Sequence, residues 1–313
     1  MAKRQLATLS LPVFVLSALD RAGYQTVEDL SGATPDSLSK DLNISLPSSQ
    51  AVFQATQMPR SVPLTQSAAL LVGGSKAYST KLAELDALLE GGLKRGFILE
   101  LSGPPGSIKE TVAMNVVSSF VEASHHVLFV DMQNMTSPAT LVRSLRTSSS
   151  APQDCQGRVH HLRIHTLPDL MIFLRNLPSY LQDHPETALL VLNSLSYPFQ
   201  SLAGLSNSTR VALLDRVKQT LTRASASTKL TVVITSQLAT KLLKPDGSAA
   251  DFETGSRAIM APALGPAYLP SAKTYRVCVV PRSRTAGVFR LLSSPLAVHG
   301  SQPPVEEAYQ LAR

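Results

Sequence analysis

The sequence predicts an α/β fold in which a central, mainly parallel β-sheet follows a small helical domain. Three observations lead to this prediction. Short apolar runs rich in β-branched residues alternate with helical stretches through the middle of the chain. One run leads into a glycine-containing turn and then a helix, which is the outline of a phosphate-binding loop. The opening region shows helical periodicity and helix-capping residues.

Composition divides the 313-residue chain into three parts. We expect a helical N-terminal domain over residues 1–58, a linker over 59–78 and an α/β core over 79–313. The linker is rich in Pro, Ser, Gly and Gln, which favour turns and loops, and it could dock a short strand. At this length the chain can bury a full core in one large domain beside a small one.

The N-terminal domain contains signals for several short helices. Residues Leu11 to Ala22 are apolar at helical spacing, and Gly23 follows as a stop. Thr26 can cap a second short helix. Thr34 precedes Pro35, which is the order of an N-cap followed by proline at the first helical position.

The core region alternates strands with helices. Its predicted strands cover residues 97–101, 127–131, 159–164, 188–192 and 230–235. Helical stretches separate them at 109–124, 136–147, 167–183 and 207–226. This alternation indicates a mainly parallel sheet with helices on both faces and ligand loops at the carboxyl ends of the strands. Two later runs, 275–280 and 288–292, predict a hairpin that extends the sheet.

The net charge of +7 is concentrated in the last third of the chain. Residues 201–313 carry fourteen basic and six acidic side chains, an excess of eight. Such an excess suits a polyanion, nucleic acid above all, because neutralised phosphates release their counterions. A merely solvated basic face is the alternative interpretation.

Several classes of protein are not expected. No apolar run approaches the ~18 residues of a membrane span, and no cleavable leader opens the chain, so we expect a soluble intracellular protein. Cys155 and Cys278 lie far apart, which predicts neither a disulfide framework nor a zinc site. His160, His161 and His165 share a predicted strand without a nearby carboxylate or cysteine, and no metal site is predicted.

The segment from Gly103 to Glu110 has the spacing of a phosphate loop but differs from it at two positions. In the pattern G-x-x-x-x-G-K-[S/T], amides surround the phosphates, lysine reaches them and the hydroxyl holds magnesium. Here Ile108 replaces the second glycine and Glu110 replaces the hydroxyl. A left-handed backbone costs a β-branched residue roughly 1–2 kcal/mol. A carboxylate about 4 Å from a phosphate charge is repelled by about 4 kcal/mol at an effective dielectric of about 20.

The order of these motifs resembles the RecA/RadA recombinase superfamily, and in detail the C-type eukaryotic paralogues of the strand-exchange recombinase. The resembling segments are residues 19–30, 37–44, 85–92, 192–199, 232–241 and 262–265. The first two segments are similar to that family's helix-hairpin-helix-like N-terminal domain. The resemblance implies a RecA-like core of the P-loop ATPase type over residues 79–313.

The resemblance also implies a hydrolytic site from which this chain departs. A glutamate that is similar to a general base is here Gln133, whose amide cannot take a proton at neutral pH. The next central strand should end in a magnesium-binding aspartate but runs into Asn193. With Ile108 and Glu110, four substitutions fall on this apparatus. We therefore expect that no catalytic residue is intact and that hydrolysis is lost.

Nucleotide binding could survive this loss. Lys109 can meet a phosphate and the loop amides can donate, although two prolines reduce their number. Gln237 ends a central strand where the family places a nucleotide-sensing residue; a plain polar strand end is the alternative. We expect ATP or ADP to bind weakly, without normal magnesium coordination. The expected nucleotide-binding residues are Gly103, Pro104, Pro105, Gly106, Ser107, Lys109 and Gln237.

The loops that face DNA in related recombinases correspond to residues 197–207 and 239–260. The first contains aromatic residues but no charge, and the second is electrostatically neutral. A denser basic cluster follows on the later hairpin, made of Arg276, Arg282, Arg284 and Arg290. We expect weak binding of single-stranded DNA, mostly through backbone phosphates. The predicted DNA-binding residues are Lys241, Lys244, Arg257, Arg282 and Arg284.

The resemblance implies a nuclear protein of homologous-recombination repair. Its expected role is that of a mediator that helps load or stabilise the strand-exchange recombinase on single-stranded DNA, in a complex with other recombinase paralogues and away from membranes. The family's self-assembly motif F-x-x-A is absent from the linker, so a homofilament is not expected. Residues 120–123 match these letters, but packing explains Phe120 better.

Two alternatives from other functional classes stay open. One is an active DNA-dependent ATPase in which Glu110 replaces both missing metal ligands. The other is a protein scaffold that binds neither nucleotide nor DNA.

Overall fold

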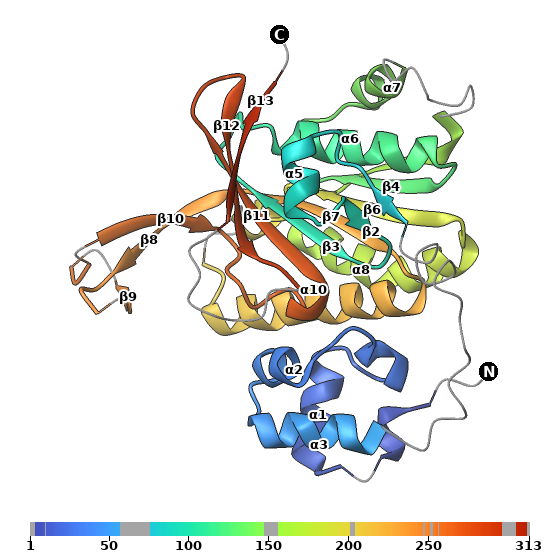
Figure 1. Cartoon of the computed structure of the whole chain (residues 1–313), viewed down its shortest axis with the longest axis vertical. Helices are drawn as coiled ribbons and strands as arrows, with labels where there is room; N and C mark the ends of the chain where they lie inside the picture. The colour runs from blue at the N-terminus through green and yellow to red at the C-terminus, as the bar shows by residue number, and fades with distance from the viewer. Residues whose placement is uncertain are drawn as a thin grey trace.

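The chain folds into a helical N-terminal unit and a larger α/β core (Figure 1). The computed structural model describes residues 4–9, 11–56, 76–146, 156–200, 204–246, 248–250, 253–255, 257–295 and 305–311. Most of the predicted linker, residues 59–75, lies outside the described residues. At its end, Ala77–Tyr78 forms the short strand β1, which pairs with β2 at Leu93–Lys94.

Short helices around one apolar cluster make up the N-terminal unit. They are η1 (Leu6–Thr8), α1 (Val13–Arg21), η2 (Val27–Leu30), α2 (Pro35–Leu42) and α3 (Leu46–Thr56). The Thr34 hydroxyl accepts the Ser37 amide at 3.2 Å, so the predicted cap of α2 is present. Thr26 precedes η2, and the Asp29 carboxylate accepts the Thr26 amide at 2.8 Å.

The core is built on one eight-stranded sheet. Its strands are β3 (Ile98–Ser102), β4 (His126–Asp131), β5 (Val159–Arg163), β6 (Thr187–Asn193), β7 (Thr231–Ser236), β11 (Thr274–Pro281), β12 (Ala286–Ser293) and β13 (Glu306–Gln310). They lie in the order β13-β12-β11-β3-β7-β6-β4-β5. The pairs from β5 to β11 are parallel, and β12 and β13 add antiparallel pairs. The predicted fold class is confirmed.

Helices cover both faces of this sheet (Figure 1). They are α5 (Ala83–Leu88), α6 (Lys109–Glu122), α7 (Pro138–Arg146), α8 (Leu167–Asp183), α9 (Tyr197–Gln200) and α10 (Asn207–Ser227), with the 3₁₀ turns η3 (Gln156–Arg158) and η4 (Ser271–Lys273). Apolar residues of α5, α6 and α7 pack on one face, and those of α8 and α10 pack on the other. The central strands are apolar throughout because both of their faces are buried.

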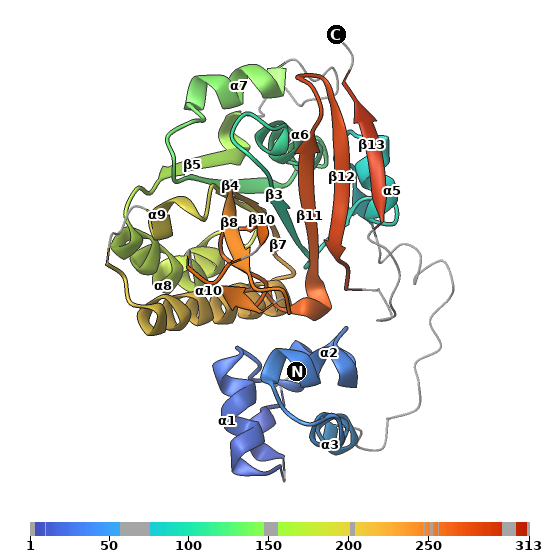
Figure 2. The same cartoon turned by 90° about the vertical axis from the view of Figure 1, so that its left-hand side faces the viewer.

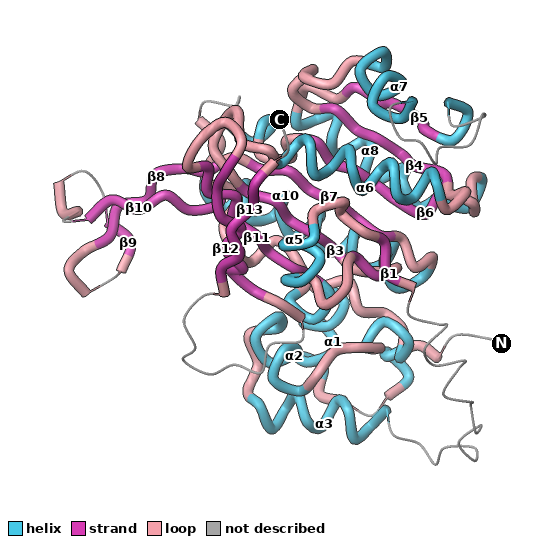
Figure 3. Tube along the Cα trace, turned by 45° about the horizontal axis from the view of Figure 1, so that its top comes forward, coloured by secondary structure: helices cyan, strands magenta, loops and turns pink. Residues whose placement is uncertain are grey.

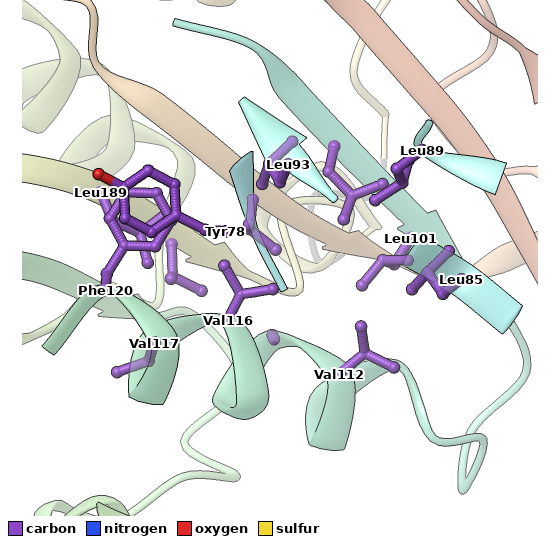
Figure 4. Packing of buried hydrophobic residues seen from close by; sticks show 14 of the residues in the cluster. Tyr78, Leu85, Leu89, Leu93, Leu101, Val112, Val116, Val117, Phe120 and Leu189 are labelled. Atoms are coloured by element: carbon purple, nitrogen blue, oxygen red, sulfur yellow. The ribbon is translucent and has the colours of Figure 1, made fainter. Parts of the chain in front are cut away.

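The α6 side of the core includes the end of the linker (Figure 4). The ring of Tyr78 in β1 stacks on the ring of Phe120 in α6, with centroids 4.0 Å apart. Phe120 is fully buried in this cluster, so its predicted packing role is confirmed.

β13, which was not predicted, closes one end of the sheet. It pairs with β12, where Gly287 lies against Tyr309. A Cβ atom at Gly287 would lie 2.5 Å from the Tyr309 hydroxyl oxygen and 2.5 Å from the Val280 carbonyl oxygen. Only glycine at position 287 therefore leaves room for the Tyr309 side chain to lie over β12.

A three-stranded ribbon projects from the core, and both views show it well away from the main sheet (Figures 1 and 3). It consists of β8 (Leu238–Leu243), β9 (Ala249–Ala250) and β10 (Arg257–Pro262), in the order β10-β8-β9. The resemblance places a loop at residues 239–260, and the structure has the strands of this ribbon there instead. The antiparallel strands β8 and β10 form backbone hydrogen bonds with each other, although neither joins the large sheet.

The helical unit packs against α10 of the core (Figure 2). Gly23 touches this helix so closely that a Cβ atom there would lie 2.8 Å from the Gln219 Cα atom. The Asp41 carboxylate accepts the Ser271 amide at 3.2 Å and lies 3.9 Å from the Lys218 ammonium. The side chains of both partners are less than 10% exposed, so the contact is built into the fold.

Candidate nucleotide and nucleic-acid site

The phosphate loop follows β3 at the carboxyl edge of the sheet. Its backbone is tight, because a Cβ atom at Gly103 would lie 2.7 Å from the Ser107 hydroxyl oxygen and 3.1 Å from the Val279 carbonyl oxygen. Gly106 has a φ of 77°, which L side chains rarely adopt. Both glycines are therefore required by the turn.

Ile108 does not strain this loop. It has a φ of −78° and a ψ of 9°, on the right-handed side of the map. The expected backbone penalty is wrong, because the left-handed position of the turn falls at Gly106 instead. The Ile108 side chain packs into the apolar cluster under α6.

Lys109 is directed back into its own loop. Its side chain is only 2% exposed, and its ammonium lies 3.0 Å from the Pro104 carbonyl oxygen and 3.5 Å from the Ser107 hydroxyl oxygen. The Glu110 carboxylate completes the set at 3.1 Å. Because an ammonium has three donors, these three partners can use all of them. A phosphate would have to replace at least one.

Asn193 is also held by neighbouring side chains. It is 1% exposed at the end of β6. Its Oδ1 accepts the Thr235 hydroxyl at 2.7 Å, and its Nδ2 donates to the Thr136 hydroxyl oxygen at 3.3 Å. The amide therefore matches one donor and one acceptor in a buried setting, which a carboxylate would not match as well.

Gln133 and Gln237 meet at the same edge of the sheet. The Gln237 Nε2 lies 3.4 Å from the Gln133 Oε1, and the Gln237 amide donates to the Ser196 hydroxyl oxygen at 3.0 Å. Asp131, the nearby carboxylate, is fully buried and accepts the Thr136 amide at 2.7 Å. Neither glutamine is a base, and Asp131 serves the turn after β4.

These residues fit a phosphate group better than they fit magnesium. The 104–109 segment has four backbone amides, and only the Ser107 amide is bonded within the turn, at 3.2 Å to the Pro104 carbonyl oxygen. Glu110 and Asn193 stand where a hydroxyl and a carboxylate would coordinate the metal, and both are committed to protein partners. The donor set thus lacks the usual magnesium ligands.

The predicted DNA-binding residues lie on two separate hairpins. Lys241 and Lys244 are in or just after β8, and Arg257 begins β10 opposite Leu243. Arg282 and Arg284 are exposed in the turn between β11 and β12. Because β11 runs parallel to β3, this turn lies at the same edge of the sheet as the phosphate loop.

The four arginines of the later hairpin do not form one basic cluster. Arg276 is buried and pairs with Glu100 at 2.5 Å, and Arg290 pairs with Glu306 at 2.6 Å. The prediction is wrong for these two because each arginine pairs with a carboxylate on a neighbouring strand, Glu100 in β3 and Glu306 in β13. Glu100 itself was missed, although a single carboxylate inside an apolar strand was a signal for it.

An apolar groove lies between α8 and β5, the terminal strand of the sheet in the described part of the chain. It has a volume of about 560 Å³, and its lining includes Leu128, His160, Leu162, Ile172, Phe173 and Leu177. The His160 Nδ1 lies 2.6 Å from the Tyr180 hydroxyl. His161 contacts the Thr136 carbonyl oxygen at 3.1 Å. The described residues contain no three-residue group of His, Cys, Asp or Glu that could hold a metal.

The fold and the site together define a class of protein, which is a RecA-like α/β core with a phosphate-type loop at the carboxyl edge of a parallel sheet. No family model matches the chain. It is 24% identical over 305 aligned positions to DNA repair protein RAD51 homolog 3 of Cricetulus griseus, covering 84% of this chain and 80% of that protein.

Two further relatives agree with this match. DNA repair protein RAD51 homolog 4 of Mus musculus is 24% identical over 233 positions, 68% of this chain and 69% of the relative. DNA repair and recombination protein RadB of Thermoplasma volcanium is 26% identical over 157 positions, 50% of this chain and 64% of the relative. These matches support a recombinase paralogue of the RecA/RadA superfamily.

No helix in the described part of the chain is both long enough and apolar enough to cross a bilayer.

Proposed function

We propose that this paralogue acts in homologous-recombination repair as a non-hydrolysing mediator in the nucleus. It assembles with other recombinase paralogues and helps to load or stabilise the strand-exchange recombinase on single-stranded DNA. The names of its relatives support the repair and recombination context. The state of the phosphate loop carries the non-hydrolysing part of the proposal.

The Lys109–Glu110 ion pair is the observation on which this proposal rests. The lysine that would stabilise the terminal phosphates is buried and paired inside the loop at 3.1 Å. Gln133 and Asn193 supply neither a proton acceptor nor a metal carboxylate. A nucleotide such as ATP or ADP would bind weakly through the loop amides. Gln237, directly before β8, would face the nucleotide.

DNA contact is assigned to the two exposed hairpins. Lys241, Lys244 and Arg257 on the ribbon would contact backbone phosphates, as would Arg282 and Arg284 beside the loop. Both sets are long cationic side chains on or between antiparallel strands. Neither set includes the aromatic side chains on which bases of single-stranded DNA usually stack. The interaction would therefore be weak and would depend on salt.

Partner assembly is assigned to the groove between α8 and β5. An extended segment of a partner paralogue could add to the β5 edge by main-chain hydrogen bonds and place apolar side chains in the groove. Ile172, 58% exposed on α8, lies in this groove. Exposed apolar side chains beside a terminal strand are typical of such docking sites.

Hydrolysis is tested with purified protein, with and without single-stranded DNA. We expect the turnover of wild-type protein to be no higher than that of the Lys109→Ala variant. Lys40→Ala, at an exposed position of α2, is the matched control. The ATPase alternative predicts turnover that both Lys109→Ala and Glu110→Thr abolish. A Lys109-dependent rate would overturn the proposal.

Binding is tested by nucleotide titration and by salt-dependent binding of single-stranded DNA. The scaffold alternative predicts that both measurements give nothing. Partner assembly is tested by co-purification, in which Ile172→Glu should release partner chains. Val211→Glu, at a similarly exposed position on α10, should retain them. Equal recovery with both variants would exclude the groove.

A further inference from the structure

One buried carboxylate connects the phosphate-loop strand to the strand beside it. Glu100 lies in the middle of β3 and is 1% exposed. Its Oε2 lies 2.5 Å from the Nε of Arg276 in β11. β3 ends two residues after Glu100, and Gly103 opens the phosphate loop directly afterwards. Displacement of this carboxylate would therefore move the first residues of the loop.

The same carboxylate accepts hydrogen bonds from both segments that join the projecting ribbon to the core. The Ser236 hydroxyl donates to Glu100 Oε1 at 3.2 Å, two residues before β8 begins. The Tyr268 hydroxyl donates to the same oxygen at 2.6 Å, shortly after β10 ends. Arg276 adds a bond from its Nη2 to the Gly265 carbonyl oxygen at 2.6 Å. The chain thus leaves the core and returns to it at the same buried ion pair.

The bonds in this network are ones that the protein cannot easily lose. A buried ion pair is stable only when hydrogen bonds satisfy its remaining atoms. Burial and the neighbouring Glu100 carboxylate raise the pKa of Tyr268 well above its ordinary value, so its hydroxyl remains a donor at neutral pH. The Arg276 guanidinium also lies over the Tyr268 ring, 5.7 Å from its centroid.

We propose that Tyr268 and Arg276 are positioning residues that link the phosphate loop to the β8–β10 ribbon through Glu100. A change of backbone at either end is transmitted to the other through these contacts. The functional meaning of the link rests on the proposed function, in which the loop binds phosphate and the ribbon binds DNA. The link itself is a property of the unliganded protein, and it is tested without either ligand.

The sharpest test is a pair of tyrosine variants. Tyr268→Phe removes only the hydroxyl that donates to Glu100. Tyr275→Phe is the matched control, because Tyr275 is fully buried in β11 and its hydroxyl has no hydrogen-bond partner among the described residues. The measurement is amide hydrogen exchange in the loop (103–109) and in the ribbon strands.

We expect Tyr268→Phe to speed exchange in both the loop and the ribbon by about tenfold, the effect of one lost bond to a charged group. Tyr275→Phe should leave both at the wild-type rate. Faster exchange confined to the segment around Tyr268, or an equal effect in both variants, would overturn the proposal.

Arg276→Lys gives a second, independent test. It keeps a positive charge beside Glu100, but one ammonium cannot also reach the Gly265 carbonyl in the same geometry. The proposal expects faster exchange in loop and ribbon together. Uniformly faster exchange across the whole sheet would indicate a merely structural role and overturn it. Failure of wild-type protein to bind nucleotide or DNA would count against the proposed function and leave this result unaffected.

Discussion

The phosphate loop and the β8–β10 ribbon arise from neighbouring central strands, but they differ in how their cationic groups are used. In the loop, Lys109 is buried and its partners belong to the chain itself. On the ribbon, Lys244 and Arg257 are exposed. The contrast teaches that the position of a cationic side chain in a motif does not by itself make its charge available to a ligand. The chain keeps the backbone of the loop and uses its charge internally, while it leaves charge available elsewhere.

The largest effect is expected where the two regions meet. Glu100→Ala leaves Arg276 buried without its carboxylate, and should lower the free energy of unfolding by about 3–5 kcal/mol. Chemical denaturation gives this value. The control is Glu306→Ala, which breaks the exposed pair with Arg290 and should cost less than about 1 kcal/mol. Equal losses would show that Glu100 has no special place in the core.

A smaller loss is expected from Asn193→Asp. The new carboxylate would be buried opposite Asp131 in the strand register and could not donate to Thr136, at a cost of about 1–3 kcal/mol. Thermal unfolding with and without magnesium gives the comparison, and Asn176→Asp at an exposed position of α8 is the control. Full rescue by millimolar magnesium would show that a carboxylate at the end of β6 can still hold the metal, and would contradict the expected loss of magnesium coordination.

Glu110→Thr should release Lys109 and restore a hydroxyl to the loop. Because Glu110 is 35% exposed, solvent screens much of its charge. We expect nucleotide affinity to rise by about tenfold, equivalent to about 1.4 kcal/mol. Calorimetric or fluorescence titration with ADP measures the change. Unchanged affinity would mean that the ion pair does not limit binding.

The smallest effects are expected for single cationic side chains on the hairpins. Removing Lys244 or Arg284 should reduce the salt dependence of single-strand binding by about 0.7 per lost phosphate contact. Binding isotherms at several salt concentrations give the slope, and Lys40→Ala serves as the control. If only one hairpin changes the slope, the DNA path is confined to that hairpin.

Much of the fold could be predicted because each central strand is an apolar run that can be recognised from its own sequence. β4 begins one residue before its predicted start and β7 ends one residue after its predicted end, since uninterrupted apolar runs leave little choice. The ribbon was missed because its strands pair only with each other and bury few side chains. β13 was missed because a five-residue segment with two glutamates lacks the usual strand pattern.

The site was harder to predict because its contacts join distant residues. The identities of Lys109 and Glu110 were plain, but the sequence does not reveal that they pair with each other. The spacing of the motif predicts backbone strain at Ile108. The left-handed residue of the turn is instead Gly106, two positions earlier. Arg276 was assigned to a DNA surface because its buried partner, Glu100, lies 176 residues away.

The contact between Gly287 and Tyr309 has a consequence for how this molecule could associate with itself. β13 occupies the outer edge of β12, so in the described part of the chain the terminal strands of the large sheet are β13 and β5. A bulkier residue at 287 would displace Tyr309, and the loss of β13 would expose the edge of β12 in its place. The unpaired N–H and C=O groups of β12 could then pair with a strand of another molecule.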